Sequence, residues 1–165
     1  LNPGKHAIWI SDLTFCYQDT DNDGIKDSLD VDSDNDGILD NVEAQASLSY
    51  IAPTGTVNAV GLDTAYVVSN GLVPVDTDKD GVADFKDANS DNDAKSDIAE
   101  RGDAKPVTLS GVLDTDKDGL LDLFEGASVS DGYVVADSNL AAPNLLGRFS
   151  AASDYFFRDK DHTPL

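Results

Sequence analysis

The chain has 165 residues, 40% of them hydrophobic, and a formal net charge of −21 at pH 7. This length is enough for one domain or two small ones, but many of the apolar residues are small, so we expect a thin core. The acidic charge argues against nucleic acid and anionic membrane as partners, and no apolar run approaches the length of a membrane-spanning helix. Cys16 is the only cysteine, which excludes an intrachain disulfide.

Residues 1–18 precede the acidic part of the chain. Within them the stretch HAIWISDLTFCY (6–17) alternates apolar and polar residues and predicts one half-buried strand. A single strand is not stable alone, so it either pairs with a later strand or is the tail of a preceding β-domain. We expect Trp9, Phe15 and Cys16 to be buried. The sequence has no Met and no signal peptide, so we expect a piece of a longer chain, present as a monomer.

Two acidic loops follow, DTDNDGIKDSLD from Asp19 and DSDNDGILDNVE from Asp32. Each places an oxygen-bearing side chain at positions 1, 3, 5, 9 and 12, glycine at position 6 and a carbonyl at position 7, as in an EF-hand calcium loop. The expected ligands are Asp19, Asp21, Asp23, Ile25, Asp27 and Asp30 in loop one, and Asp32, Asp34, Asp36, Ile38, Asp40 and Glu43 in loop two. The loops start 13 residues apart, which leaves no room for a helix between them. We therefore expect Asp30 and Asp32 to face neighbouring ions.

The pattern returns in loop three at Asp76, in loop four at Asn89 and in loop five at Asp114. In loop four Ala94 replaces the glycine at position 6, where a positive φ would be a strain, so we expect weaker binding there. The expected ligands are Asp76, Asp78, Asp80, Val82, Asp84 and Asp87; Asn89, Asp91, Asp93, Lys95, Asp97 and Glu100; and Asp114, Asp116, Asp118, Leu120, Asp122 and Glu125. The five loops contain 24 of the 32 acidic residues, so we attribute the acidity to about five bound calcium ions. Mg²⁺ is disfavoured because each loop offers six or seven oxygens without water.

The insert between the two loop pairs, residues 44–75, contains short β-type runs around Tyr50 and at Tyr66–Val68. Its centre, TVNAVGLDTAY, has the form of a calcium loop that has lost most of its ligands. We expect no strong metal site there.

The segment after Gly126 is poor in metal ligands and rich in Gly and Tyr. Near its end FFRDKD (156–161) echoes DFKDAN (84–89), so Asp159 and Asp161 either complete a further metal site or form an exposed charged tail. No sixth loop abuts loop five, so we expect an ion in this region to have an open coordination position. Tyr133, Tyr155 and Asp159 are the candidate ligand-binding residues.

These patterns predict a mainly loop and β fold, in which residues 19–165 form a single calcium-stabilised domain with short β-strands. We expect at most a helical turn after position 9 of loops two and five. Nothing indicates an enzyme, because no nucleophile stands beside a base, and His6 and His162 lie at the chain ends. Oxygen-ligand sites of moderate affinity are filled where calcium is millimolar, which favours an extracellular or cell-surface location.

The pattern D-x-D-x-D-G-x-x-D-x-x-D at Asp19 to Asp30 resembles the thrombospondin type 3 repeat. The interrupted pairs of loops and the lack of cystine also resemble the calcium-dependent peptide-binding domain of large bacterial RTX adhesins, over most of residues 19–161. This resemblance implies a module of a secreted adhesin in which a bound Ca²⁺ engages the carboxylates of a short extended peptide. The alternatives are a calcium-rigidified structural spacer and a glycan-binding module.

Overall fold

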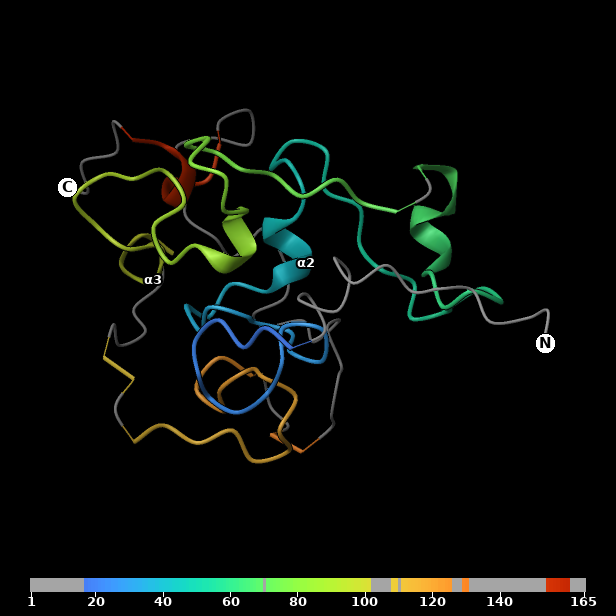
Figure 1. Ribbon diagram of the computed structural model, residues 1–165, viewed down its shortest axis with the longest axis horizontal. Helices are drawn as coiled ribbons and strands as arrows, with labels where there is room; N and C mark the ends of the chain where they lie inside the picture. Colours follow the sequence, from blue (N-terminus) through green and yellow to red (C-terminus); the bar gives the residue numbers. More distant parts are fainter. Residues whose placement is uncertain are drawn as a thin grey trace, which may run out of the picture.

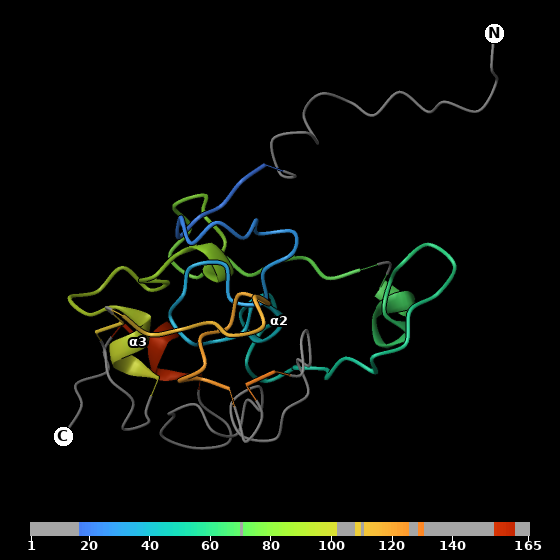
Figure 2. The same ribbon diagram turned by 90° about the horizontal axis from the view of Figure 1, so that it is seen from below.

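The computed structural model describes residues 17–69, 71–101, 108–109, 111–125, 129–130 and 154–160. Most of these residues form irregular structure and turns, and the helical elements are short (Figures 1 and 2). The elements are the α-helices α2 (Asp40–Glu43) and α3 (Asp97–Glu100), and the 3₁₀-helices η1 (Thr64–Ser69), η2 (Asp84–Lys86) and η4 (Phe156–Arg158). No helix in this part of the chain is long and apolar enough to cross a membrane. The expectation of a mainly loop fold with little helix is confirmed.

The helices α2 and α3 both begin at position 9 of a loop and end at position 12. The helical turn expected in loop two is therefore confirmed. Loop five forms turns at Asp122–Phe124 instead of a helix, and the helix of loop four was not expected. Asp40–Glu43 and Asp97–Glu100 occupy equivalent positions in loops two and four. The second loop of each pair therefore ends in a short α-helix.

The expectation of short β-strands is not confirmed. Within the described residues the only β-pairing is the isolated bridge between Val57 and Asp63. The expected run at Tyr66–Val68 forms part of η1 instead. Asp63 starts this helix, since its Oδ1 accepts the N–H of Ala65 at 2.8 Å and its carbonyl accepts the N–H of Tyr66 at 3.0 Å. The N-terminal run 6–16 lies outside the described residues.

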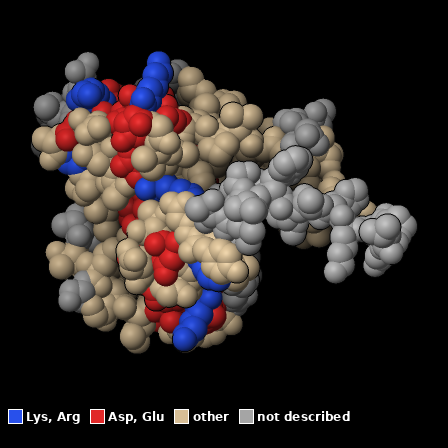
Figure 3. Space-filling model, viewed as in Figure 1, with Lys and Arg blue, Asp and Glu red and all other residues tan. Residues whose placement is uncertain are grey.

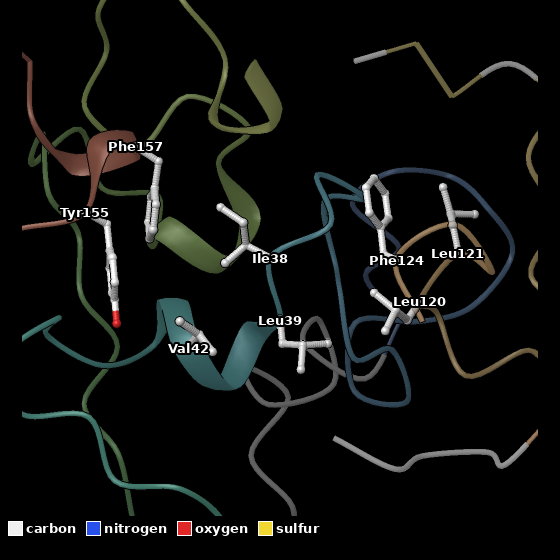
Figure 4. Packing of buried hydrophobic residues seen from close by; sticks show 8 residues of the cluster. All are labelled: Ile38, Leu39, Val42, Leu120, Leu121, Phe124, Tyr155 and Phe157. Atoms are coloured by element: carbon white, nitrogen blue, oxygen red, sulfur yellow. The ribbon is translucent and has the colours of Figure 1, made fainter. Parts of the chain in front are cut away.

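The hydrophobic core joins loop two to loop five. In each loop it uses the residues at positions 7, 8 and 11, and two aromatic residues of the C-terminal segment complete it (Figure 4). The eight core residues are Ile38, Leu39, Val42, Leu120, Leu121, Phe124, Tyr155 and Phe157. Among the residues that the structure describes, the loops themselves therefore supply most of the buried apolar side chains, and no sheet or helix bundle supports the loops.

Candidate metal centres

All five acidic loops are closed by the same backbone hydrogen bond. The N–H of the residue at position 9 donates to the carbonyl of the residue just before the loop, over 2.8 to 3.0 Å. The five bonds are Asp27 to Gln18, Asp40 to Val31, Asp84 to Val75, Asp97 to Ala88 and Asp122 to Leu113. The loop register predicted from the sequence therefore corresponds to one repeated backbone structure.

The side chain at position 9 closes each loop a second time. Its carboxylate accepts the N–H and the hydroxyl of the Thr or Ser at position 2, as when Asp84 accepts from Thr77 N at 2.7 Å and from Thr77 Oγ1 at 2.8 Å. The pairs are Thr20–Asp27, Ser33–Asp40, Thr77–Asp84, Ser90–Asp97 and Thr115–Asp122. These five aspartates, which the sequence predicts as metal ligands, thus also make a structural contact that closes the loop. The signal was visible in the sequence, because position 2 is Thr or Ser in every loop.

The carboxylates at positions 1, 3 and 5 converge on the inside of the loop. Three groups of this kind, and a fourth that combines positions 3, 5 and 12 of loop four, bring one oxygen from each residue within 4.8 Å of the others. They are Asp19, Asp21 and Asp23; Asp32, Asp34 and Asp36; Asp76, Asp78 and Asp80; and Asp91, Asp93 and Glu100. In loop five the Asp114 carboxylate accepts the N–H groups of Lys117 at 2.6 Å and Gly119 at 3.2 Å. These acidic groups can hold metal ions.

Position 4 of every loop, and position 6 of every loop except loop four, have a positive φ. The glycines at position 6, in loops one, two, three and five, have φ between +80° and +100°, and the residues at position 4 have φ between +57° and +67°. The residues at position 4 are Asn22, Asn35, Lys79, Asn92 and Lys117. Ala94 at position 6 of loop four does not have a positive φ. The backbone strain expected at Ala94 is therefore absent, and loop four still brings its carboxylates together.

The acidic groups of loop two lie in the interior and repel one another. Burial raises the pKa of Asp36 to about 7, and burial followed by the charges of nearby aspartates raises the pKa of Asp32, Asp34 and Glu43 well above the usual range. Both side-chain oxygens of Asp34 and of Glu43 are buried and accept no hydrogen bond. A buried carboxylate needs a partner, so these all-oxygen groups fit a hard divalent cation.

The junction between loops one and two brings Asp30 close to Asp32. Asp30 Oδ1 accepts the N–H of Asp32 at 2.9 Å. Burial, followed by the charges of Asp23, Asp21 and Asp40, raises the pKa of Asp30 to about 8. Asp30 thus lies beside the acidic groups of both loop one and loop two.

The two loop pairs repeat the same internal contact. The amide of Asn35 in loop two donates to Asp21 Oδ2 in loop one, and the amide of Asn92 in loop four donates to Asp78 Oδ2 in loop three at 2.6 Å. Each contact joins position 4 of the second loop to position 3 of the first. Loops one and two therefore form the same unit as loops three and four.

The sequence similarity between residues 156–161 and residues 84–89 of loop three corresponds to a similar packing in the structure. The helix α2 contacts η2, and α3 contacts η4. Lys86 of η2 pairs with Asp27 at 2.6 Å, and Arg158 of η4 pairs with Asp84 at 2.6 Å. In both cases a basic residue of the later segment meets the position-9 carboxylate of an earlier loop. The segment 154–160 thus packs on the second loop pair as loop three packs on the first.

The remaining candidate residues fall in different environments. Asp159 is partly buried, and its charge helps to raise the pKa of Asp91, for which burial is the main cause. Tyr155 is only 1% exposed and stacks on Phe157 with ring centroids 5.5 Å apart, so its ring is part of the core and offers no surface to a ligand. Asp161 and Tyr133 lie outside the described residues.

Charged side chains of both signs share the surface around the loops. Figure 3 shows Lys and Arg beside the Asp and Glu side chains on the face that it views. Lys95, whose carbonyl we expected to bind metal, places Nζ 3.6 Å from Glu100 Oε1 in loop four. Local cations thus balance part of the acidic charge.

The chain matches no protein-family model, and comparisons with curated proteins and with solved structures found no significant similarity.

Proposed function

We propose that this protein is a calcium-stabilised extracellular module that binds an acidic ligand at an exposed calcium ion. The observation that carries the calcium assignment is the set of buried carboxylate oxygens in loop two that accept no hydrogen bond, notably both oxygens of Asp34 and of Glu43. Seven-coordinate Ca²⁺ uses carboxylates and a backbone carbonyl, and each loop offers both. Mg²⁺ prefers to retain several waters, which the interior position of loop two disfavours.

A hollow between loops one and five is the best place for an external ligand. It has a volume of about 400 Å³, within the range of small-ligand sites. Its lining combines acidic, basic and apolar residues, including Asp23, Ile25, Val112, Asp114, Lys117 and Leu121. Asp23 and Asp114 occupy metal-ligand positions, so an ion in either loop lies at the wall of the hollow. A ligand carboxylate can complete such an ion while Lys117 adds a second positive charge.

This arrangement supports a short peptide with an acidic group and an aliphatic side chain. The carboxylate would meet the ion and Lys117, and the aliphatic group would contact Ile25 and Val112. The resemblance to the peptide-binding domain of bacterial RTX adhesins favours the same class of ligand and a location on the cell surface.

A substitution that fills the hollow tests this site. Ile25 contributes two backbone groups to loop one, the carbonyl expected to bind the ion and the N–H that donates to Asp23 Oδ1 at 2.6 Å. Ile25→Trp changes neither group, so it should leave calcium binding intact and abolish binding of an acidic peptide, measured by calorimetry in Ca²⁺. The matched control is Val82→Trp, at the same position 7 of loop three, where the side chain is 41% exposed; it should bind the peptide normally. Amidating the peptide carboxylate should remove most of the affinity, and equal binding of both peptides would refute the ion-mediated contact.

The repeated packing of the loop pairs favours a second candidate, a calcium-rigidified spacer. The contacts α2–η2 and α3–η4 join successive units in the same way, as expected for a connector that adds one unit after another. A spacer would bind neither acidic peptides nor sugars at millimolar calcium. Binding of sugars but not of peptides would instead indicate a glycan-binding module.

A further inference from the structure

Three buried carboxylates from different loop pairs meet between loop two and α3. One oxygen each of Asp36, Glu43 and Asp97 lies within 4.8 Å of the other two, and the three residues are 2%, 0% and 0% exposed. Asp36 and Glu43 are the position-5 and position-12 residues of loop two, whereas Asp97 stands at position 9 of loop four. The loop pattern in the sequence does not place Asp97 beside loop two.

Two of these residues have buried oxygens that accept no hydrogen bond, namely both side-chain oxygens of Glu43 and Oδ2 of Asp36. The charge of Arg101 lowers the pKa of Asp36, but burial outweighs this effect. Three carboxylates confined at this distance in a dry interior repel one another. A cation placed among them would remove the repulsion and satisfy the buried oxygens.

Ser90 holds the Asp97 carboxylate in place and leaves it able to bind a metal. Ser90 N lies 3.1 Å from Oδ1 and 2.9 Å from Oδ2, and Ser90 Oγ donates to Oδ2 at 2.7 Å. Each carboxylate oxygen has two lone pairs. Oδ1 therefore keeps a lone pair for a metal ion while the Ser90 contacts fix its direction.

The surroundings of Asp97 differ from those of the equivalent residues in loops one and three. Asp27 and Asp84 each meet a basic side chain at 2.6 Å, from Lys86 and Arg158 respectively. Asp97 meets the two carboxylates of loop two instead. The charge of Asp97 therefore faces two carboxylates, whereas the charges of Asp27 and Asp84 face a lysine and an arginine.

We propose that Asp97 is a ligand of the calcium ion of loop two, so that one ion joins the two loop pairs. Loop two supplies Asp36 and Glu43, and α3 supplies Asp97 from 54 residues further along the chain than Glu43. The proposal rests on the calcium binding proposed above and does not require the external ligand. Calcium would then determine how the two loop pairs are placed relative to each other, as well as how each loop folds.

The test compares three variants by calcium titration, with the amide resonance of Gly37 reporting on loop two, since Gly37 N donates to Asp32 Oδ2 at 2.8 Å. Asp97→Asn keeps the size of the side chain and removes its charge, and should lower the calcium affinity of loop two about ten-fold or more. Asp122→Asn changes the same position of loop five and should leave the affinity of loop two within about three-fold, because it removes no carboxylate from this ion. Ser90→Ala removes one contact that directs the Asp97 carboxylate but keeps its charge, so it should lower the affinity less than Asp97→Asn does.

A crystal structure of the wild-type protein grown with Ca²⁺ decides the question even if Asp97→Asn does not fold. An Asp97 oxygen should lie about 2.3 to 2.6 Å from the ion bound by Asp36 and Glu43. An ion bound by loop two alone, or an unchanged loop-two affinity in Asp97→Asn, would overturn the proposal. Loss of peptide binding with the Asp97 contact intact would count against the external ligand site and leave this proposal standing.

Discussion

Arg158 donates from Nε to Asp84 Oδ2 at 2.6 Å and so connects the C-terminal segment to loop three, 74 residues earlier. The same guanidinium donates from Nη1 to the carbonyl of Gln45 at 2.7 Å and from Nη2 to the carbonyl of Glu43. Arg158 is 7% exposed, so these bonds are made away from water. One side chain thus holds together loop three, the end of α2 and η4.

Replacing Arg158 should be among the most destabilising single substitutions. Arg158→Ala leaves the buried Asp84 charge unpaired and should lower the free energy of unfolding by about 3 to 5 kcal/mol. Urea denaturation in saturating Ca²⁺ measures this. Arg158→Lys should recover part of the loss, because it restores the charge but not the planar set of donors. A change below about 1 kcal/mol for Arg158→Ala would contradict this role.

The contact between positions 2 and 9 should contribute stability through its hydroxyl. Thr77→Val keeps the volume of the side chain but removes the bond from Oγ1 to Asp84 Oδ2, which measures 2.8 Å. We expect a loss of about 1 to 3 kcal/mol in the free energy of unfolding. Thr77→Ser is the control, since Ser stands at the same position in loops two and four; it should lose less than half as much as Thr77→Val.

Alanine substitutions at two position-6 glycines distinguish the effect of packing from the effect of backbone strain. Gly37 and Gly24 have φ of +80° and +100°, so alanine is strained at both. A Cβ at Gly37 would come within 2.7 Å of the Phe124 ring and would also meet Arg101, whereas a Cβ at Gly24 would have nothing within 4 Å. Gly37→Ala should therefore destabilise the calcium-loaded protein by about 1 to 3 kcal/mol more than Gly24→Ala. Equal losses in thermal unfolding would show that loops two and five do not pack as described.

The chain without calcium should be most stable at mildly acidic pH. Burial raises the pKa of Asp30 to about 8 and of Asp36 to about 7, so at pH 7 the metal-free fold retains protons that an unfolded chain, with its aspartate pKa near 4, has already lost. The metal-free fold therefore loses stability as the pH rises from about 4 through 8. Amide NMR spectra in excess EDTA should show more dispersion near the acidic end of this range than near its upper end, and equal dispersion at both would contradict this pH dependence.

The sequence predicted the local structure of the metal loops well. The convergence of Asp19, Asp21 and Asp23, and of the equivalent residues in other loops, follows from spacing within a dozen residues. The contacts between separate loop pairs could not be predicted from the sequence. The cluster of Asp97 with Asp36 and Glu43 depends on how separate loop pairs pack, and no short-range pattern encodes that packing.

The packing of loop five on loop two was missed for a related reason. The apolar residues at positions 7, 8 and 11, such as Ile38 and Leu120, were visible, but we treated position 7 only as a carbonyl donor. The strand expected at Tyr66–Val68 is wrong for a different reason. There the β-branched residues favoured a strand, while the side chain of Asp63 bonds to the backbone and starts a helix instead.

The most direct test of the account is the amide NMR spectrum of the whole chain with and without calcium. The loops confine carboxylates whose buried oxygens need a cation, and the hydrophobic cluster formed by the described residues is small. The account predicts a dispersed spectrum at millimolar Ca²⁺ that collapses in excess EDTA and returns when calcium is restored. A spectrum that keeps its dispersion in excess EDTA would contradict the claim that bound calcium holds this fold together.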